Sequence, residues 1–355
     1  MRAVRWHGRG DVRFETVPDA PEPGPGEIRL AVAWCGLCGS DVLEYRSGPF
    51  LIPVARPHPV TGRRAPLILG HEISGRITDA GARAARAGLT PGTPVVLNAL
   101  LPCRKCDSCR AGDWHLCPDF GHLGMSADGG LADLLTVPAE MAVPVPAGLD
   151  AETAALGEPF AVAWHLLRRV GMPRGRRCLV VGAGSIGLAA ALVLCTRDNA
   201  VTVADTEPAR LAIAEALGLR PLPVGPGSGD GPAAEYGGAD VVLECSGTGP
   251  GFALACRAAR PGGTVGLAGL PDRPVPFDVA AAAHRELTLA GSMSHQTDAD
   301  LRPALDFLAG HAEEAGRLIT GRVELPHAVR EGLDTLAGPD RGRHIKILVR
   351  AGGTA

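Results

Sequence analysis

Residues 178-CLVVGAGSIGLAAALVLCTRDNAVTVADT-206 decide the fold of this 355-residue chain. An apolar run ends in the pattern G-x-G-x-x-G, a helical apolar segment follows, and a second apolar run ends at Asp205. Gly182, Gly184 and Gly187 permit a tight turn and let a pyrophosphate approach the backbone, while the following helix supplies N–H groups and the positive end of its dipole. The motif has the strand, helix and later acid that it requires, so it predicts a dinucleotide-binding βαβ unit and not an idle Gly-rich turn.

The side chains around this motif favour NAD over NADP. Ser185 and Ile186 fill the variable positions of the turn, and Asp205 would bind the two hydroxyls of the adenosine ribose. Its charge would repel a 2′-phosphate, and the next residue, Thr206, offers no cation. Arg210 lies close by in the sequence and keeps NADP as an alternative.

The composition is that of a globular protein without an electrostatic partner surface. The net charge is -3, so nothing indicates binding to nucleic acid or to an acidic membrane. Residues 178–195 carry no charge, but their three patterned glycines argue against a membrane span. The polar N-terminus lacks the apolar core of a signal peptide, and ten cysteines in a cytoplasmic protein are not expected to form disulfides. We therefore predict a cytoplasmic location.

The pattern of elements predicts an α/β protein with two domains. Up to about residue 150, short alternating runs separated by Gly and Pro indicate a mostly β region. Residues 152–171 have helical spacing, and from 178 strands alternate with helices, which implies a parallel sheet with βαβ crossovers. The Gly-rich stretch 225–238 is predicted to be a surface loop, and a helix and further strands follow residue 295.

Four cysteines lie within fifteen residues and predict a structural metal site. Thiolates this close would repel one another unless a cation took up their charge, and a closed S4 shell is typical of structural zinc. The spacing is C-x2-C-x2-C-x7-C, with basic residues between the thiols. Such a lobe has little apolar content, so zinc would supply its folding energy. An iron–sulfur cluster and disulfides are the alternatives. The four residues are Cys103, Cys106, Cys109 and Cys117.

A second candidate centre begins in 28-IRLAVAWCGLCGSDVLEY-45. C-G-x-C after a strand is typical of thiol redox sites, but a cysteine before Gly-Ser-Asp is also typical of catalytic zinc. Taken alone, His71 could be a core histidine and Glu158 a helix cap. With Cys38 and Glu72 they supply one sulfur, one nitrogen and two carboxylates, a set that fits catalytic zinc with an open position. Asp41 would accept the other ring N–H of a ligating histidine.

The chain as a whole resembles the zinc-containing medium-chain dehydrogenase/reductase superfamily. The motifs that carry this resemblance are C-G-x-C-G-S-D, G-H-E, the four-cysteine lobe, DGGLADLLTVPA, G-E-P, G-x-G-x-x-G and HIKILV. Residues 48–72, together with the opening RAVRWHGRGDVR and 34–41, resemble (R,R)-2,3-butanediol dehydrogenases, and sorbitol and threonine dehydrogenases are more distant. The resemblance implies a GroES-like catalytic domain, a Rossmann domain and a C-terminal return to the first domain. These segments are residues 1–155 with a zinc lobe at about 102–118, residues 156–295 and residues 296–355.

The resemblance also implies roles for individual residues. Cys38, His71 and Glu158 would be the catalytic zinc ligands, with Glu72 taking turns as a ligand, so each chain would bind two zinc ions. Ser40 would hydrogen-bond the substrate oxygen, beside the acceptor Asp41. Lys346 stands where the family often places a basic residue near the cofactor pyrophosphate, although a surface lysine is the simpler interpretation. Tyr45 and Phe50 are candidate substrate-pocket residues. Family habit suggests a homodimer or homotetramer.

The predicted activity is NAD-dependent oxidation of a secondary alcohol, such as a vicinal diol, hydroxyketone or polyol. A sugar, cyclitol or amino-alcohol substrate, an inactive nucleotide-binding relative, and a thiol oxidoreductase using Cys35 and Cys38 are the alternatives. One departure stands out, because many relatives place a histidine five residues after the metal cysteine to pass a proton to solvent. Here that residue is Leu43, so the proton would leave through Ser40 to water, or to a carboxylate, Glu44 or Glu72. The sequence leaves the substrate and its stereochemistry open.

Overall fold

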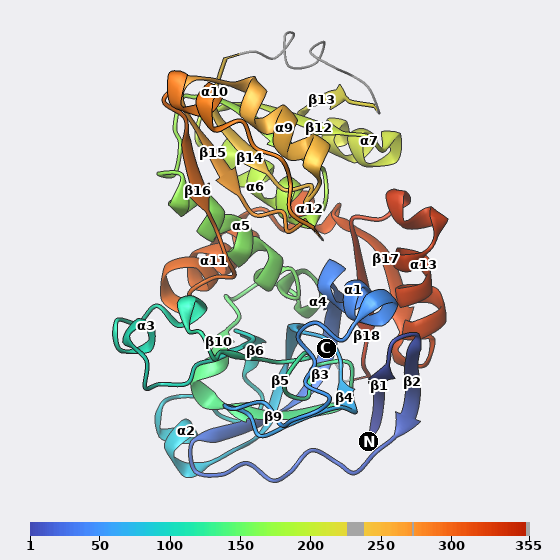
Figure 1. Ribbon diagram of the computed structural model, residues 1–355. Helices are drawn as coiled ribbons and strands as arrows, with labels where there is room; N and C mark the ends of the chain where they lie inside the picture. Colours follow the sequence, from blue (N-terminus) through green and yellow to red (C-terminus); the bar gives the residue numbers. More distant parts are fainter. Residues whose placement is uncertain (226–237, 272, 353–355) are drawn as a thin grey trace. The chain divides into compact units, whose positions relative to one another are not determined.

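A computed structural model describes residues 1–225, 238–271 and 273–352 (Figure 1). Most of the predicted surface loop at 225–238 lies outside the described residues. Contacts between Cα atoms divide the chain into two compact units. The first unit comprises Met1–Glu158, Gln296–Ala312 and Ile319–Ala355, and the second comprises Pro159–His295 and Glu313–Leu318. Helix α5 (Gly157–Arg169) leads the chain from the first unit into the second.

The second unit is built on a six-stranded parallel sheet. Its strand order is β13-β12-β11-β14-β15-β16, which starts in the middle, runs to one edge, and then returns to fill the other side. This is the order of a doubly wound dinucleotide-binding sheet, whose ligand site lies where the order reverses, between β11 and β14. The strands are β11 (Arg177–Val181), β12 (Ala200–Asp205), β13 (Arg220–Pro223), β14 (Ala239–Glu244), β15 (Ala259–Leu267) and β16 (Thr288–Gly291).

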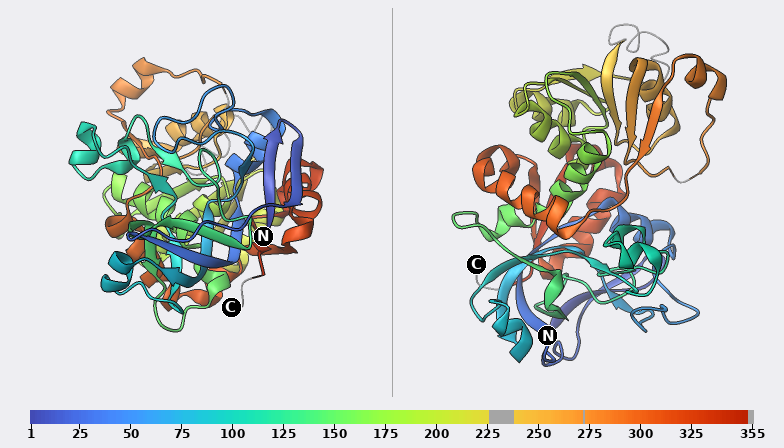
Figure 2. Two further views of the ribbon diagram at one scale, coloured as in Figure 1. Left: turned by 90° about the horizontal axis from the view of Figure 1, so that it is seen from below. Right: turned by 90° about the vertical axis from the view of Figure 1, so that its left-hand side faces the viewer.

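Helices cover the faces of this sheet (Figure 2). Helix α6 (Ser185–Cys195) packs on β11 and β12, and α9 (Gly249–Ala258) packs on β14 and β15. Most residues of the central strands β11, β12 and β14, and residues 187–194 of α6, are buried and mainly apolar, as expected for strands covered on both faces. The remaining helices of this unit include α7 (Pro208–Ala216) and α10 (Val279–His284).

The first unit is organised around β3 (Glu27–Leu37), the strand that carries the C-G-x-C motif. It pairs antiparallel with β5 (Glu72–Ala80), β9 (Leu134–Pro138) and β18 (Lys346–Arg350), so segments from far apart in the sequence meet along it. The sheet continues through β6 (Pro94–Leu97) and β10 (Ala142–Pro144) on one side and β17 (Ile319–Glu324) on the other. The two ends of the chain are also tied together, since Arg2 donates to the carbonyl of Ala351 at 3.3 Å.

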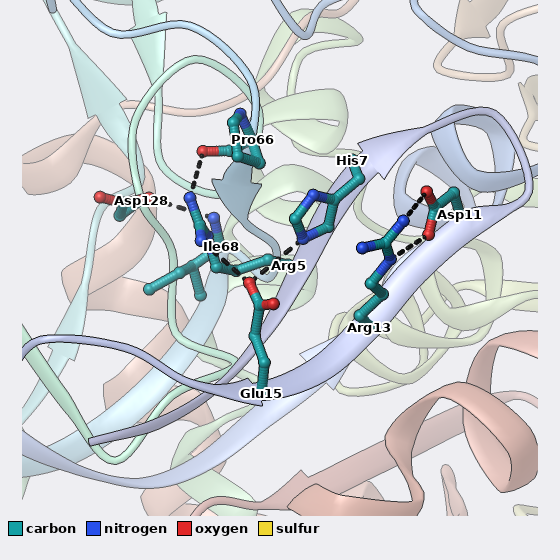
Figure 3. Close-up of polar contacts among 8 residues, drawn as sticks. All are labelled: Arg5, His7, Asp11, Arg13, Glu15, Pro66, Ile68 and Asp128. Carbon is teal, nitrogen blue, oxygen red and sulfur yellow. Dashed lines mark hydrogen bonds and ion pairs between the residues drawn. The ribbon is translucent and has the colours of Figure 1, made fainter.

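A smaller sheet joins β1 (Arg2–Gly8) to β2 (Asp11–Thr16) and β4 (Leu67–Ile68). Its outer face carries a charge ladder, shown in Figure 3. The Glu15 carboxylate accepts from Arg5 at 2.9 Å and contacts the His7 ring at 3.1 Å, and Arg5 also donates to the carbonyl of Pro66. The backbone N–H of Ile68 donates to Asp128, so side chains hold this sheet to the loops beside it.

The remaining strands and helices of the first unit connect these sheets. Among the described residues, no helix is long and apolar enough to cross a membrane, and α6, the predicted apolar helix, has eleven residues. The elements are α1 (Gly39–Ser47), α2 (Ala82–Arg86), β7 (Leu100–Leu101), α3 (Asp107–Arg110), β8 (Gly121–His122), α4 (Ala151–Ala154), α11 (Arg302–Gly310) and α13 (Asp334–Ala337), and α12 (Ala312–Gly316) leads back into the second unit.

Candidate active site and metal centres

Cys38, His71 and Glu72 meet at the end of the central strand β3. Cys38 follows β3 directly and is the N-cap of α1, while Glu72 begins β5, whose register places it opposite Gly36. The thiol sulfur of Cys38, a ring nitrogen of His71 and a carboxylate oxygen of Glu72 all lie within 4.8 Å of one another. Sulfur, imidazole nitrogen and carboxylate oxygen are the ligand types that zinc takes in proteins.

Two glycines make room for this cluster. A Cβ on Gly36 would overlap the Glu72 carboxylate, so this position of the C-G-x-C motif must lack a side chain. Gly70 has φ +92°, and a Cβ there would lie 2.5 Å from the Cys35 sulfur. That left-handed conformation is one that glycine adopts without strain, and it turns the chain into His71. The glycines next to the cysteine and the histidine are therefore part of the site's construction.

Asp41 connects two of the three donors. One carboxylate oxygen accepts the backbone N–H of Cys38 at 2.9 Å, and the other lies 3.6 Å from Nδ1 of His71. Burial opposes protonation of the His71 ring, but the charge and hydrogen bonding of Asp41 and of Cys38 together outweigh burial and raise the pKa of His71 well above its usual value. The opposite ring nitrogen, Nε2, lies 3.5 Å from Oγ of Ser40. This leaves Nε2 as the ring nitrogen suited to a metal, with a serine hydroxyl beside it.

The carboxylate of Glu72 is paired on one side only. Its Oε1 accepts from the Lys346 ammonium at 2.5 Å, whereas Oε2 is buried and has no hydrogen-bond partner in the protein. Lys346 also donates to the carbonyl of Leu37 at 3.0 Å, and both charged side chains are 2% exposed or less. An unpartnered buried carboxylate oxygen is costly unless it has a ligand to bind, and Oε2 is one of the atoms that a metal could use.

The buried charges around Cys38, His71 and Glu72 also fit a divalent cation. Asp41, Glu72 and Glu158 are all buried, with the Lys346 ammonium among them. Burial, reinforced by the charges of Glu72 and Asp41, raises the pKa of Glu158 to about 7 against the opposing effects of His71 and Lys346. A cation would offset this excess of buried negative charge. Glu158 is close enough to feel these charges, but its oxygens are not in the compact group of donors that contains Glu72.

The four-cysteine lobe forms a second cluster of donors. The sulfurs of Cys103, Cys106, Cys109 and Cys117 lie within 4.8 Å of one another, and those of Cys103 and Cys109 are 3.9 Å apart, far beyond a disulfide bond. All ten cysteines, each of them a described residue, are free. The backbone N–H of Lys105 lowers the pKa of Cys103 to about 6, while burial raises that of Cys109 to about 12. A cation is needed for all four to be thiolates together, and this arrangement fits zinc.

The glycine loop of the second unit has the shape that its motif predicts. Gly182 has φ +104°, and a Cβ there or on Gly187 would meet backbone atoms, whereas a Cβ on Gly184 would meet nothing within 4 Å. Gly184, Ser185 and Ile186 are partly exposed at the N-terminus of α6. This open space above a helix N-terminus is the cradle that a pyrophosphate would occupy.

Asp205 is held at the end of β12 beside this loop. Its carboxylate accepts backbone N–H groups from Ala183 at 2.6 Å and from Glu207 at 2.9 Å. Nη1 of Arg210 lies 3.9 Å from the same carboxylate. A fixed negative charge therefore stands where the adenosine ribose would bind, with one guanidinium at its side.

Comparison with known proteins identifies the family of the chain. The family model described as "Alcohol dehydrogenase GroES-like domain" matches residues 24–147, and the family model described as "Zinc-binding dehydrogenase" matches residues 185–310. The (R,R)-butanediol dehydrogenase of Bacillus subtilis is 30% identical over 358 residues, which cover 99% of each protein. The chain belongs to the zinc-binding alcohol dehydrogenase family. It is therefore an oxidoreductase, and the predicted fold class and family resemblance are confirmed.

Solved structures of the family agree over the whole chain. The crystal structure of 2R,3R-butanediol dehydrogenase from Bacillus subtilis superposes with a TM-score of 0.89 at 29% identity, covering 98% of this chain and 99% of that one. A protein from Sinorhizobium meliloti, provisionally named as a zinc-binding dehydrogenase and solved with NADP, has a TM-score of 0.85 at 28% identity, covering 98% of each chain. Family members therefore include one that was solved with NADP.

The structure shows the surroundings of four residues that were given roles in the sequence analysis. Lys346 is not a surface lysine, because its ammonium is buried against Glu72, and its role at a cofactor pyrophosphate stays a prediction. Glu44 does not fit a proton relay, because it is buried and its carboxylate accepts the backbone N–H groups of Phe50 and Leu51. Glu72 lies in the compact donor group and Glu158 outside it, and the role of Glu158 as a zinc ligand stays a prediction.

The two candidate substrate residues have different surroundings. The hydroxyl of Tyr45 donates to Asp334 on α13 at 2.7 Å, and this contact raises the pKa of Tyr45 to about 12. Tyr45 thus links α1 to the C-terminal part of the first unit. Phe50 instead exposes 60% of its surface, so its ring is accessible to a ligand.

One residue beside the metal cluster was missed in the sequence. The ring of His122 on β8 packs edge-to-face on His71, with centroids 4.9 Å apart, and its Nδ1 lies 2.8 Å from the carbonyl of Leu123. Strand β8 pairs with β7, and the chain between these two strands is the four-cysteine lobe. A histidine directly after that lobe was the available signal, but only strand pairing brings it to His71.

Proposed function

We propose that this chain is a zinc-dependent, NAD-linked dehydrogenase of a small secondary alcohol, such as a vicinal diol, hydroxyketone or polyol. The observation that carries the proposal is the buried group of Cys38 sulfur, His71 nitrogen and Glu72 oxygen within 4.8 Å. The overall reaction converts R2CHOH and NAD⁺ into R2C=O, NADH and a proton. A sugar, cyclitol or amino-alcohol intermediate is the second candidate substrate class.

The residues of the first unit would hold and orient the reactants. When bound, a zinc ion would supply a Lewis acid for the substrate oxygen and the nicotinamide would accept the hydride. Asp41 lies 3.6 Å from Nδ1 of His71 and accepts the backbone N–H of Cys38, so its carboxylate stands where it would orient both donors for a metal. Lys346 neutralises Glu72 and leaves its Oε2 as the donor. Glu158 would be a further or alternating ligand.

The proton of the substrate hydroxyl needs an exit. We propose that Oγ of Ser40, which lies 3.5 Å from Nε2 of His71, hydrogen-bonds the substrate oxygen and passes its proton to water. Leu43 cannot take that proton, and the carboxylate of Glu44 is occupied by backbone N–H groups. Water next to Ser40 is therefore the acceptor that the chain leaves available.

The second unit would bind the cofactor through its glycine loop. The pyrophosphate would lie over Gly184, Ser185 and Ile186, and Asp205 would take the ribose hydroxyls. The Asp205 carboxylate would repel a 2′-phosphate, which supports NAD as the cofactor. Nη1 of Arg210 lies 3.9 Å from that carboxylate and could contact a 2′-phosphate, so we expect a low residual activity with NADP. Four thiols in the lobe and three donors at the end of β3 support two zinc ions per chain.

We propose that the chain assembles into a homodimer or a homotetramer. Within the described part of the second unit, β16 is the last strand of the sheet, and its outer edge has no partner strand. In the same unit, Leu270 and Val279 are largely exposed, and α10 has no buried residue. An open edge beside apolar side chains supports association. The free cysteines support a reducing compartment, the cytoplasm.

Metal analysis with one substitution tests the proposed function. Cys38→Ala should remove one of two zinc ions and lower kcat/KM for NADH formation on the order of a thousandfold, because a Lewis acid contributes several kcal/mol. Cys35→Ala is the matched control, since Cys35 is buried nearby but outside the donor group, and it should keep both ions. One zinc per chain in the wild type, with activity unchanged in Cys38→Ala, would contradict the proposal.

A further inference from the structure

Exposed apolar side chains gather in residues 43–54, next to the candidate catalytic cluster. Leu43, Phe50, Leu51 and Val54 expose 44%, 60%, 51% and 48% of their surface. We call these four residues the apolar rim. Single exposed apolar residues are common on proteins, but a group of four within twelve residues indicates a binding surface.

The rim begins, along the chain, three residues after Ser40 of the candidate catalytic cluster. Ser40 and Leu43 are three residues apart on α1 and so lie on the same face of this helix. Oγ of Ser40 is 3.5 Å from Nε2 of His71, which places Leu43 one helical turn from the nitrogen that would face a metal. Phe50 and Leu51 fold back to the neighbouring residue Glu44 through two hydrogen bonds. A molecule bound at Ser40 and His71 would extend toward these apolar side chains.

The protein holds the rim in place. The buried carboxylate of Glu44 accepts the N–H of Phe50 at 3.0 Å and that of Leu51 at 2.5 Å. On the other side, Arg9 donates to the carbonyls of Ser47 at 2.9 Å and Gly48 at 3.3 Å. Ile52, between the exposed residues, is buried in the core of the first unit. The exposed side chains therefore sit on a fixed backbone, which is how a preorganised contact surface is built.

We propose that the apolar rim binds an apolar substituent of the substrate, so that the enzyme takes secondary alcohols or hydroxyketones with an alkyl or aryl group in preference to polyols. This inference rests on the proposed dehydrogenase function and narrows its substrate class. A polyol at this position would place hydroxyl groups against Leu43 and Phe50, where they would lose hydrogen bonds to water. An alkyl chain would instead gain by burial against the same side chains.

A homologous series of alcohols tests the inference. Rates of NADH formation would be measured with alkan-2-ols from propan-2-ol to octan-2-ol and with xylitol. We expect kcat/KM to rise about two- to fourfold per methylene, the upper value corresponding to complete burial of a CH2 group. Leu43→Asn and Phe50→Ser should flatten this rise without removing zinc. Phe14→Ser, which changes an exposed phenylalanine on β2, is the matched control and should keep it.

The outcomes separate the inference from the proposed function. A rate that does not depend on chain length, or a higher kcat/KM for xylitol than for the alkanols, would overturn the apolar rim as a substrate contact. An unchanged rise in both folded variants would do the same. If no alcohol reduces NAD or NADP with zinc present, the proposed function itself fails. Circular dichroism melts of each variant establish that the compared proteins are folded.

Discussion

The two donor clusters of this enzyme are built in opposite ways. Cys38, His71 and Glu72 stand on paired strands and a helix N-terminus, and Asp41 and Lys346 hold them from outside the cluster. The four cysteines of the lobe lie on a loop with two short helical turns, α3 and Trp114–Leu116. One cluster is a product of the fold, whereas the other has only its own thiols to organise it.

The difference follows from what surrounds each cluster. The catalytic donors lie at the edge of a large core, so burial of apolar side chains orders them whether or not an ion is bound. The lobe contributes little to such a core, and Leu116 within it exposes 58% of its surface. Cation–π contact of Arg104 with Trp114, at 6.0 Å, is a weak substitute. We therefore expect metal to fold the lobe but only to complete the catalytic cluster.

The largest predicted effect is on the dynamics of the lobe. Chelation of zinc should increase amide hydrogen exchange in residues 103–117 on the order of a hundredfold or more, because metal binding supplies most of the local folding free energy. Exchange in β3, next to the catalytic donors, should change far less. Exchange is measured by mass spectrometry after proteolysis. The Cys109→Ser variant is the control: its lobe should exchange fast without chelator and respond no further to it. Equal changes in exchange in the lobe and in β3 would show that the two clusters do not differ in their dependence on metal.

A smaller effect is predicted for the glycine beneath the catalytic cluster. Gly36→Ala places a methyl group against the Glu72 carboxylate, so this donor must move. Displacing a positioned ligand should weaken zinc binding by about 10- to 100-fold. Competition with a chromophoric chelator measures the affinity. Gly39→Ala is the matched control, since a Cβ there meets nothing within 4 Å, and equal affinities of the two variants would show that the fold does not prearrange Glu72.

The smallest effect concerns the proton exit of the candidate catalytic cluster, where Leu43 follows Ser40 by three residues and cannot take a proton from it. Leu43→His would place an imidazole of ordinary pKa one helical turn from Ser40. We expect a gain in oxidation rate near neutral pH on the order of tenfold or less, with one additional ionisation in the pH–rate profile. In the wild type we expect the oxidation rate to rise with pH, because the reaction releases a proton. A profile identical to that of the wild type would show that proton exit does not limit this enzyme.

The sequence predicted the second unit better than the details of the first. G-x-G-x-x-G with Asp205 at its proper distance is a local pattern, and its strand, turn and helix have the order that the residues indicate. The cysteine spacing of the lobe is also local, and its four sulfurs lie together. The surroundings of Lys346, Glu44 and His122 were harder to predict, because their partners come from segments up to 309 residues away or are backbone groups that carry no sequence signal.

By itself, the sequence determined what depends on short spacing: the glycine turn, the thiol cluster, the candidate ligands Cys38 and His71, and the leucine in place of a histidine. Only the tertiary structure decided that Glu72 lies beside Cys38 and His71, and where the buried lysine points. Strand pairing sets both, because β5 places Glu72 opposite Gly36 while β18 brings Lys346 to the same strand end. Long-range register is fixed by burial of whole strand faces, and no short stretch of sequence specifies it.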